Sequence, residues 1–188
     1  NNGTAKNSSS VTILNSVPIH NNPKLTTLTG KNLSTENLTC NNQTTSDVDN
    51  DNIVNIYNWY KNNRSITVLN LPFEINSEDY SNNNNNGMIS GAVFTNGQIG
   101  RALEFDGVDD FVNLSRPTSL INLDRNLSVE AWVFSDNNTG QHLVFDECEF
   151  FATEGYCLLI LDNEFRFHVG LAGAPKAIAG GIQTGRWY

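Results

Sequence analysis

The second half of the sequence consists of short apolar runs separated by turn residues, a pattern that favours β-strands over helices. In the run at residues 165–169, the Phe and Val side chains point one way while Arg166 and His168 point the other. No long segment has the period of about 3.6 residues that marks an amphipathic helix. We therefore predict an all-β fold, an antiparallel β-sandwich or jelly roll. The apolar runs are Ala102–Phe105, Leu127–Val133, Leu143–Phe145, Leu158–Leu161 and Phe165–Val169.

Composition divides the chain into four parts. Residues 1–10 are polar and predict a flexible arm. Residues 11–75 contain further strand-like runs, beginning with Val11–Ile19, and predict a small β unit. Residues 76–91 are rich in Asn and predict a linker or long loop. Residues 92–188 hold the regular strand pattern and predict a separate β-sandwich domain.

The charge balance and the hydropathy pattern exclude several classes of partner. The chain has 20 acidic and 11 basic residues and a net charge of -9, which disfavours nucleic acid and anionic membranes. It contains no apolar run of about 18 residues, so we predict no membrane span. The start at Asn1–Thr4 lacks the basic and apolar regions of a signal peptide and suggests a mature or trimmed N-terminus.

Glycosylation sequons give the main indication of compartment. The nine Asn-x-Ser/Thr triplets are more than this composition gives by chance, although an Asn-rich chain creates some of them without selection. Together they predict an N-glycosylated extracellular or cell-surface protein. The triplets begin at Asn2, Asn7, Asn32, Asn37, Asn42, Asn63, Asn113, Asn126 and Asn137.

The three cysteines fit an oxidising compartment. Cys148 and Cys157 flank a short polar stretch between two apolar runs, and a disulfide across the base of that hairpin is sterically reasonable. The alternative is a pair of buried thiols. Either way, Cys40 is left without a partner within the chain.

One acidic loop has the spacing of a cation site. Asp47, Asp49 and Asp51 alternate within five residues, so their carboxylates can converge on a hard cation such as calcium. The glycine and the bidentate glutamate of an EF-hand do not follow, which excludes that motif. The alternative is a solvated polar turn.

Four segments together resemble the laminin-G-like, concanavalin-A-like superfamily over about residues 78–188. They are Gly100–Leu114, Leu127–Val133, Gly155–Ile160 and Gly185–Tyr188. The resemblance implies a β-sandwich that binds sugars or proteins or serves as a spacer. In most members the first Asp of the turn at Asp106, Asp109 and Asp110 fixes the backbone, and some members hold calcium nearby. The tryptophans Trp59, Trp132 and Trp187 occupy strand positions and are expected to pack in the core.

Residues 35–72 resemble the first half of an immunoglobulin-like sandwich beside such a domain in archaeal-type surface proteins. The segments that carry this resemblance are Leu38–Cys40, Asn58–Asn62 and Leu69–Phe73. The cysteine that usually pairs with the strand-B cysteine would lie on a later strand that this sequence does not contain. We therefore expect a partial immunoglobulin-like unit.

Laminin-G-like domains generally continue past the Trp-Tyr pair that closes this sequence, so the resemblance implies an incomplete sandwich. Either the sequence is truncated, or another chain supplies the missing strands. In the second case, Val11–Ile19 is the natural donor segment and the chain self-associates into an oligomer or filament.

Some hydrolases of this superfamily carry alternating carboxylates on one strand, which makes Asp146, Glu147 and Glu149 candidates for catalysis. The longer Glu-x-Asp-x-x-Glu pattern of those enzymes is absent. His20, His142 and His168 show no metal-ligand spacing. We predict no enzymatic activity, and expect a structural or adhesion protein that binds glycans or proteins. The alternative is a carbohydrate-binding module or a glucanase-like enzyme on the same fold.

Overall fold

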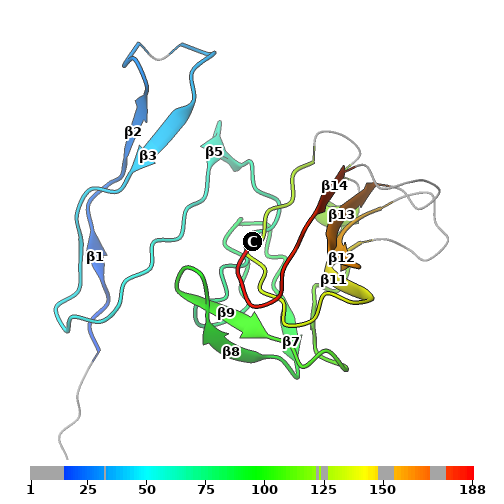
Figure 1. Ribbon diagram of the computed structural model, residues 1–188. Coiled ribbons are helices and arrows are strands. Elements are labelled where there is room, and N and C mark those ends of the chain that lie inside the picture. Colours follow the sequence, from blue (N-terminus) through cyan, green and yellow to red (C-terminus); the bar gives the residue numbers. More distant parts are fainter. Residues whose placement is uncertain (1–14, 32, 122, 124–126, 148–154, 170–176) are drawn as a thin grey trace, which may run out of the picture. The chain divides into compact units, whose positions relative to one another are not determined.

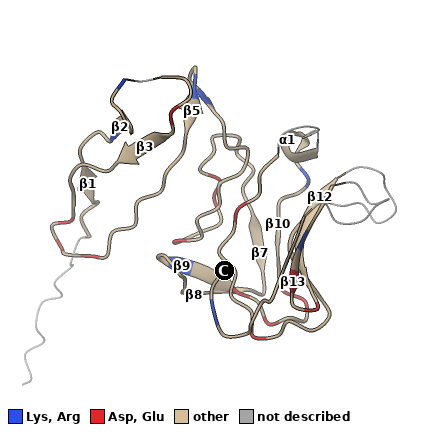
Figure 2. Cartoon of the chain, turned by 45° about the horizontal axis from the view of Figure 1, so that its top comes forward, with Lys and Arg blue, Asp and Glu red and all other residues tan. Residues whose placement is uncertain are grey.

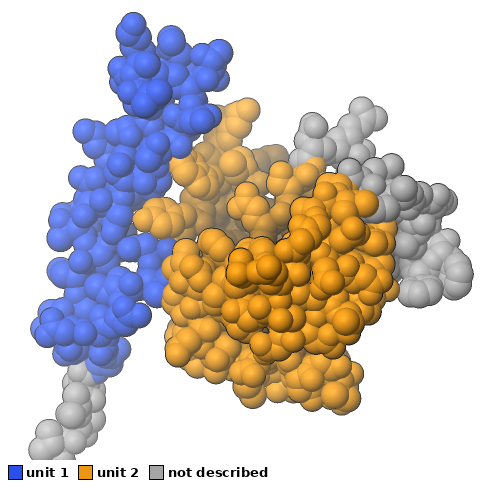
Figure 3. All heavy atoms as spheres, viewed as in Figure 1, with its two compact units in different colours: residues 1–55 blue, residues 56–188 orange. Residues whose placement is uncertain are grey.

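The computed structural model describes residues 15–31, 33–121, 123, 127–147, 155–169 and 177–188 (Figure 1). Within these ranges the regular elements are strands, apart from the four-residue helix α1 (Thr118–Ile121). All strand pairs are antiparallel. The prediction of an all-β fold with antiparallel sheets is therefore confirmed. The chain forms two compact units, Asn1–Asn55 and Ile56–Tyr188, which are coloured separately in Figure 3.

The first unit contains two small strand pairs. β1 (Ile19–His20) pairs with β4 (Thr45–Ser46), and β2 (Lys24–Thr27) pairs with β3 (Leu38–Asn41). None of its described apolar side chains is fully buried. Isolated two-stranded pairs of this kind are marginally stable in water, so hydrogen bonds in the loops contribute to the stability of this unit.

The β2–β3 loop is held by the carboxylate of Glu36. This carboxylate accepts the backbone N–H groups of Thr29 and Leu33, each at 3.0 Å, and also the hydroxyl of Thr29. The hydrogen bonds from Thr29 and Leu33 lower the pKa of Glu36.

The second unit begins with three further strand pairs. β5 (Tyr60–Lys61) pairs with β6 (Arg64–Ser65) across a turn in which Asn62 and Asn63 have positive φ, as expected for a tight hairpin. β7 (Met88–Ser90) pairs with β10 (Phe111–Asn113). β8 (Val93–Asn96) pairs with β9 (Arg101–Glu104).

The Asn-rich segment 76–91 is a hydrogen-bonded loop as far as Gly87, and its residues Met88–Ser90 form β7. The carboxylate of Asp79 accepts the N–H groups of Asn70, Ser81 and Asn85, each at 2.9 Å, and the Ser81 hydroxyl at 2.7 Å. Ser81 and Asn85 are buried, and both also donate to the carbonyl of Val68 at 2.9 Å. Partial burial raises the pKa of Asp79, but the hydrogen bonds outweigh it and hold the pKa below its ordinary value.

The largest sheet is a four-stranded antiparallel meander with the order β11-β12-β13-β14. Its strands are β11 (Gln141–Asp146), β12 (Tyr156–Leu161), β13 (Glu164–Val169) and β14 (Ala177–Gly180). The inner strand β12 carries four buried residues, of which Ile160 is 1% exposed. Asp162 and Asn163 have positive φ in the β12–β13 turn, as the Asp-Asn signal predicts.

Tyr156 anchors this sheet at the end of β12 that faces α1. Its ring stacks on Phe145 at 5.4 Å between centroids, and its hydroxyl donates to the carbonyl of Leu120 at 3.0 Å. Burial, aided by the nearby Glu147 carboxylate, raises the pKa of Tyr156 to about 12. The tyrosine therefore stays neutral and remains a hydrogen-bond donor over the physiological range.

The prediction that Leu127–Val133 forms a strand is wrong. Val133 and Tyr188 exchange backbone hydrogen bonds of 3.0 and 2.9 Å, and an isolated antiparallel bridge joins Phe134 to Trp187. No backbone hydrogen bond joins residues 127–132 to any other described residue. The alternation of apolar and polar residues is present. A ladder of backbone hydrogen bonds also needs a neighbouring strand, and the described residues provide none for residues 127–132.

Candidate functional site

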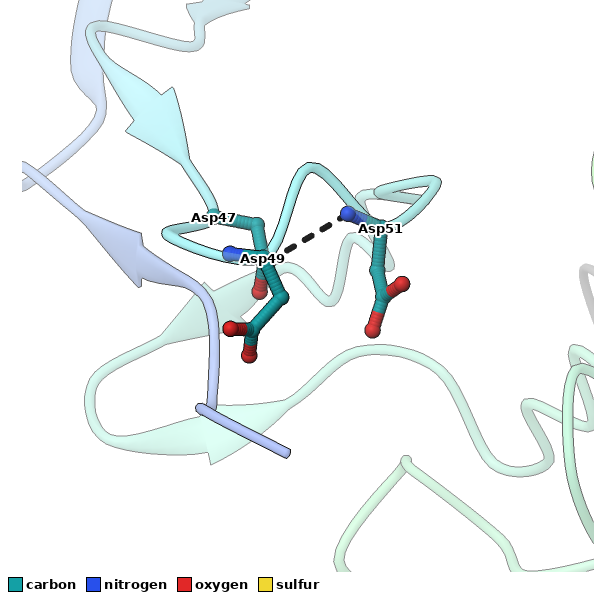
Figure 4. Close-up of side chains that lie close together, drawn as sticks. All are labelled: Asp47, Asp49 and Asp51. Carbon is teal, nitrogen blue, oxygen red and sulfur yellow. Dashed lines mark hydrogen bonds between the residues drawn. The ribbon is translucent and has the colours of Figure 1, made fainter. Parts of the chain in front are cut away.

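The acidic loop after β4 brings the three predicted carboxylates together. The ligand oxygens of Asp47, Asp49 and Asp51 all lie within 4.8 Å of one another. One oxygen of Asp47 accepts the backbone N–H of Asp49 at 2.7 Å and that of Asp51 at 3.3 Å, which folds the loop back on itself (Figure 4). The predicted convergence is confirmed, and its cause is a local turn organised by Asp47.

The other carboxylate oxygen of Asp47 is the unusual feature of this loop. This atom, Oδ2, is shielded from solvent and has no hydrogen-bond partner among the described residues. Asp49 differs, since its Oδ2 accepts the backbone N–H of Ser16 at 2.6 Å. The loop carries no Lys or Arg that would neutralise its charge (Figure 2). Carboxylate oxygens in this arrangement are the ligands that hard divalent cations prefer.

A second acidic cluster, Asp106, Asp109 and Asp110, also has ligand atoms within 4.8 Å of one another. Its hydrogen bonds organise the turn between β9 and β10. Asp110 accepts the N–H of Asp106 at 2.9 Å, and Asp106 accepts the N–H of Val108 at 2.8 Å. Asp110 also packs against Gly91, where an added Cβ would lie 1.6 Å from its Oδ1. These contacts fit the structural role that we predicted for the turn.

The described sequon asparagines all lie on the surface. They are Asn37, Asn42, Asn63, Asn113 and Asn137, and all five are exposed. Asn37 and Asn42 flank β3, Asn63 lies in the β5–β6 turn, and Asn113 ends β10. The remaining candidates, Asn2, Asn7, Asn32 and Asn126, lie outside the described residues. A glycan on each described asparagine would extend into solvent.

The sequon at Asn137 forms an Asx turn. Its side-chain oxygen accepts the backbone N–H of Thr139 at 3.0 Å and the Thr139 hydroxyl at 2.8 Å. This Asx turn holds the amide and the hydroxyl of one sequon side by side.

The carboxylates that we considered for catalysis are not arranged as a facing pair in the described part of the chain. Glu147 forms an ion pair with Arg116 at 3.2 Å, and its side chain is only 8% exposed. Asp146 is exposed at the end of β11, and Glu149 lies outside the described residues. Glu147 is thus engaged by a cation rather than by a second carboxylate.

The cysteines and tryptophans depart in part from expectation. Cys157 is a buried free thiol, Cys40 is a half-buried free thiol, and Cys148 lies outside the described residues, so the predicted disulfide is not observed. Trp59 and Trp187 are half-buried, and Trp187 packs on Phe134 at 5.4 Å. Trp132 is 58% exposed, which corrects the prediction that it packs in the core. It belongs to the unpaired stretch 127–132, where no described strand lies alongside.

Comparison of the chain with family models, with curated proteins and with solved structures finds no match. Within the described residues, no helix combines the length and the apolar character that crossing a bilayer requires.

Sequence reasoning missed the Asp79 cluster. Its signal was an Asp-x-Ser spacing inside a segment that composition alone marks as a linker. It also missed the pairing of Val133 with Tyr188, which joins residues far apart in the sequence and leaves no local pattern.

Proposed function

We propose that this chain is an extracellular, N-glycosylated structural or adhesion protein without catalytic activity, which self-associates by strand donation. The observation that carries the proposal is the exposure of all five described sequon asparagines on turns, strand ends and loops. An acidic and amide-rich surface with glycans at these points suits a protein that works in solvent outside the cell.

The laminin-G-like sandwich is the fold that we propose for residues 92–188. Tyr156, Leu158 and Ile160 share one face of β12 by strand alternation. Phe165 and Phe167 lie opposite Ile160 and Leu158 in the register of β13. Tyr156 and Ile160 on this face are buried, as they would be beneath the second layer of a β-sandwich.

Self-association is supported by apolar side chains in the first unit that the described structure leaves uncovered. Val17 is 80% exposed and Ile19 is 63% exposed, in the segment Val11–Ile19 that we predicted as a donor strand. Of this segment only Ile19 lies in a strand, and residues 11–14 lie outside the described chain. An uncharged, strand-like segment with exposed apolar groups suits addition to a sheet edge of a neighbour.

The proposal is tested on protein purified from its native surface, by intact mass, peptide mapping and electron microscopy. We expect a mass above the 20.8 kDa polypeptide, glycans at the exposed sequons Asn37, Asn42, Asn63, Asn113 and Asn137, and ordered assemblies. An unmodified mass together with single particles at all concentrations would refute both parts of the proposal. Modified single particles would leave an adhesion role and remove self-assembly.

Carbohydrate binding is the second candidate, and the exposed Trp132 favours it. An indole with 58% of its surface in solvent offers a platform for stacking on a sugar ring. Binding to immobilised glycans that Trp132→Ala abolishes, while Trp59→Ala retains, would favour this role over structural assembly.

We also propose that Asp47, Asp49 and Asp51 hold calcium. Asp47→Asn is expected to weaken Ca²⁺ binding at least about tenfold, because it removes charge and the shielded oxygen from the ligand set. Isothermal titration with Ca²⁺ measures this, with Asp136→Asn as the control at an exposed carboxylate outside both clusters. Absence of binding heat in the unmodified protein, or equal affinity in Asp47→Asn, would show that the loop is a solvated turn.

A further inference from the structure

One face of the β7–β10 pair carries exposed apolar side chains beside a sequon asparagine. Phe111 is 52% exposed and Met88 is 64% exposed. The two strands lie side by side in Figure 2, and their register places Asn113 directly opposite Met88. The opposite face of the pair holds Val112 and Ile89, which are half-buried. The sequon asparagine therefore shares the exposed face with both apolar side chains.

Strand geometry places these three side chains within reach of one another. Phe111 and Asn113 are two residues apart on β10, so their side chains leave the same face about 7 Å apart. The Cβ atoms of Met88 and Asn113 lie about 5 Å apart, as expected for residues directly opposite each other in an antiparallel pair. A sugar attached to Asn113 thus has an apolar neighbour along the strand and another across it.

The Asn113 side chain is held with its amide nitrogen free. Its Oδ1 accepts the backbone N–H of Ser115 at 2.7 Å, which closes an Asx turn within the sequon. Among the described residues, no hydrogen bond engages Nδ2 of Asn113 or the hydroxyl of Ser115, and both residues are exposed. Glycosylation uses this nitrogen, which bonds to the anomeric carbon of a phosphate-activated sugar. The phosphate leaves with the electrons of the broken C–O bond, and one amide proton goes to solvent.

The other described sequons lack this combination of features. Asn113 is the only sequon asparagine in the sequence that follows an aromatic residue by two positions. In the sequon of Asn63, the Ser65 hydroxyl is half-buried and already donates a hydrogen bond within the fold. In the sequon of Asn137, the Thr139 hydroxyl donates to the side chain of the asparagine itself. Among the described sequons, only that of Asn113 therefore joins an exposed aromatic side chain on one strand face to an unengaged sequon hydroxyl.

We propose that the first sugar ring of a glycan on Asn113 packs on the ring of Phe111 and covers the side chain of Met88. This inference rests on the proposed glycosylation and assigns one glycan a binding surface on its own chain. The C–H groups on one face of a pyranose form an apolar surface that suits an aromatic ring. Neither β7 nor β10 contains a charged residue that would keep this exposed face soluble, so the sugar takes that role. A glycan on Asn113 needs solvent on this face, which places Phe111 beside the sugar.

Oxidation of Met88 by dilute hydrogen peroxide tests the coverage in the full, glycosylated chain. Met88 is the only methionine, so its peptide reports a single thioether, which takes one oxygen atom from the peroxide and leaves water. We expect oxidation to be at least about fivefold faster in Asn113→Gln than in the protein with this sequon intact, because the thioether loses its cover. Ser115→Ala also removes the sequon but keeps Asn113, and should give the same increase. Asn137→Gln removes a sequon outside the strand pair and should leave the rate unchanged.

Phe111→Leu tests the stacking itself, since it keeps an apolar side chain on β10 and removes the aromatic ring. In the NMR spectrum of the glycosylated protein, the C–H protons on one face of the first sugar at Asn113 should be shifted upfield, as protons above an aromatic ring are. Phe111→Leu should abolish this shift without changing glycan occupancy in the peptide map. The matched control Phe134→Leu removes another partly exposed ring, 43% exposed and outside the strand pair, and should leave the shift in place.

The outcomes separate this inference from the proposed function. If Asn113 carries no glycan while other sequons do, the inference is overturned and the glycoprotein proposal stands. The same holds if Asn113 is glycosylated but Met88 oxidises equally fast with and without its glycan. Sugar protons without an upfield shift, or a shift that persists in Phe111→Leu, overturn the packing on Phe111. Absence of glycans from every sequon overturns both proposals.

Discussion

Asp79→Ala is expected to destabilise the second unit by about 3 kcal/mol, because each buried donor left without an acceptor costs about 1 kcal/mol or more. The carboxylate accepts the backbone N–H groups of Asn70, Ser81 and Asn85. Alanine leaves all three without that acceptor and leaves the Val68 carbonyl as the remaining acceptor of the buried Ser81 hydroxyl. The loop would open and admit water to the interior of the unit.

Urea unfolding followed by tryptophan fluorescence measures this loss. All three tryptophans lie in Ile56–Tyr188, so the signal reports the second unit. Asp109→Ala is the matched control, since that carboxylate is exposed and none of the described hydrogen bonds involves it. Equal unfolding midpoints for the two variants would mean that the Asp79 cluster contributes nothing to stability.

The difference in stability between the unmodified protein and Asp79→Ala should change with pH in a defined direction. The pKa of Asp79 is lowered from 3.8, so the unfolded chain binds the proton more readily than the folded one. The stabilisation is therefore fully present above pH 3.8 and declines as the pH falls through the folded-state pKa. We expect the difference between the unmodified protein and Asp79→Ala to be largest near neutral pH and to shrink in acid.

The sequence predicted those strands whose signal is local. Residues 158–161 and 165–169 are strands because their apolar content or alternation fits the centre of a sheet and a tight Asp-Asn turn joins them. The same kind of pattern at residues 127–133 was not sufficient to form a strand. A strand exists only with a partner, and pairing with a distant segment leaves no trace in the local sequence.

Among the polar segments, the predicted linker shows the same limit, whereas the acidic loop does not. Composition marks residues 76–91 as a spacer, yet Ser81 and Asn85 are buried because the Asp79 carboxylate collects donors from Asn70 onwards. Long-range convergence of this kind cannot be seen from residue frequencies. Asp47, Asp49 and Asp51 converge within five residues through one turn, and that convergence was predictable from spacing.

Ile160→Ala is expected to cost about 2–5 kcal/mol, the range for deleting a fully buried aliphatic side chain. Ile160 is 1% exposed on the inner strand β12, between His142 of β11 and Phe165 of β13 in the sheet register. Removing three carbons there opens a cavity that close-packed neighbours fill only in part. Tyr156 and Leu158, on the same face of β12, would lose support at one end of their apolar row.

Ile178→Ala is the matched control, because it makes the same chemical change on β14, where the side chain is 56% exposed. We expect this change to cost less than about 1 kcal/mol, since most of the deleted surface already contacts water. The urea midpoints of the two variants show how the stability lost at Ile160 compares with the stability lost at Ile178. A large difference would show that the inner strand β12, where Ile160 is buried, contributes more to stability than the exposed edge strand β14. Equal losses would mean that the side chain of Ile178 is also covered in solution.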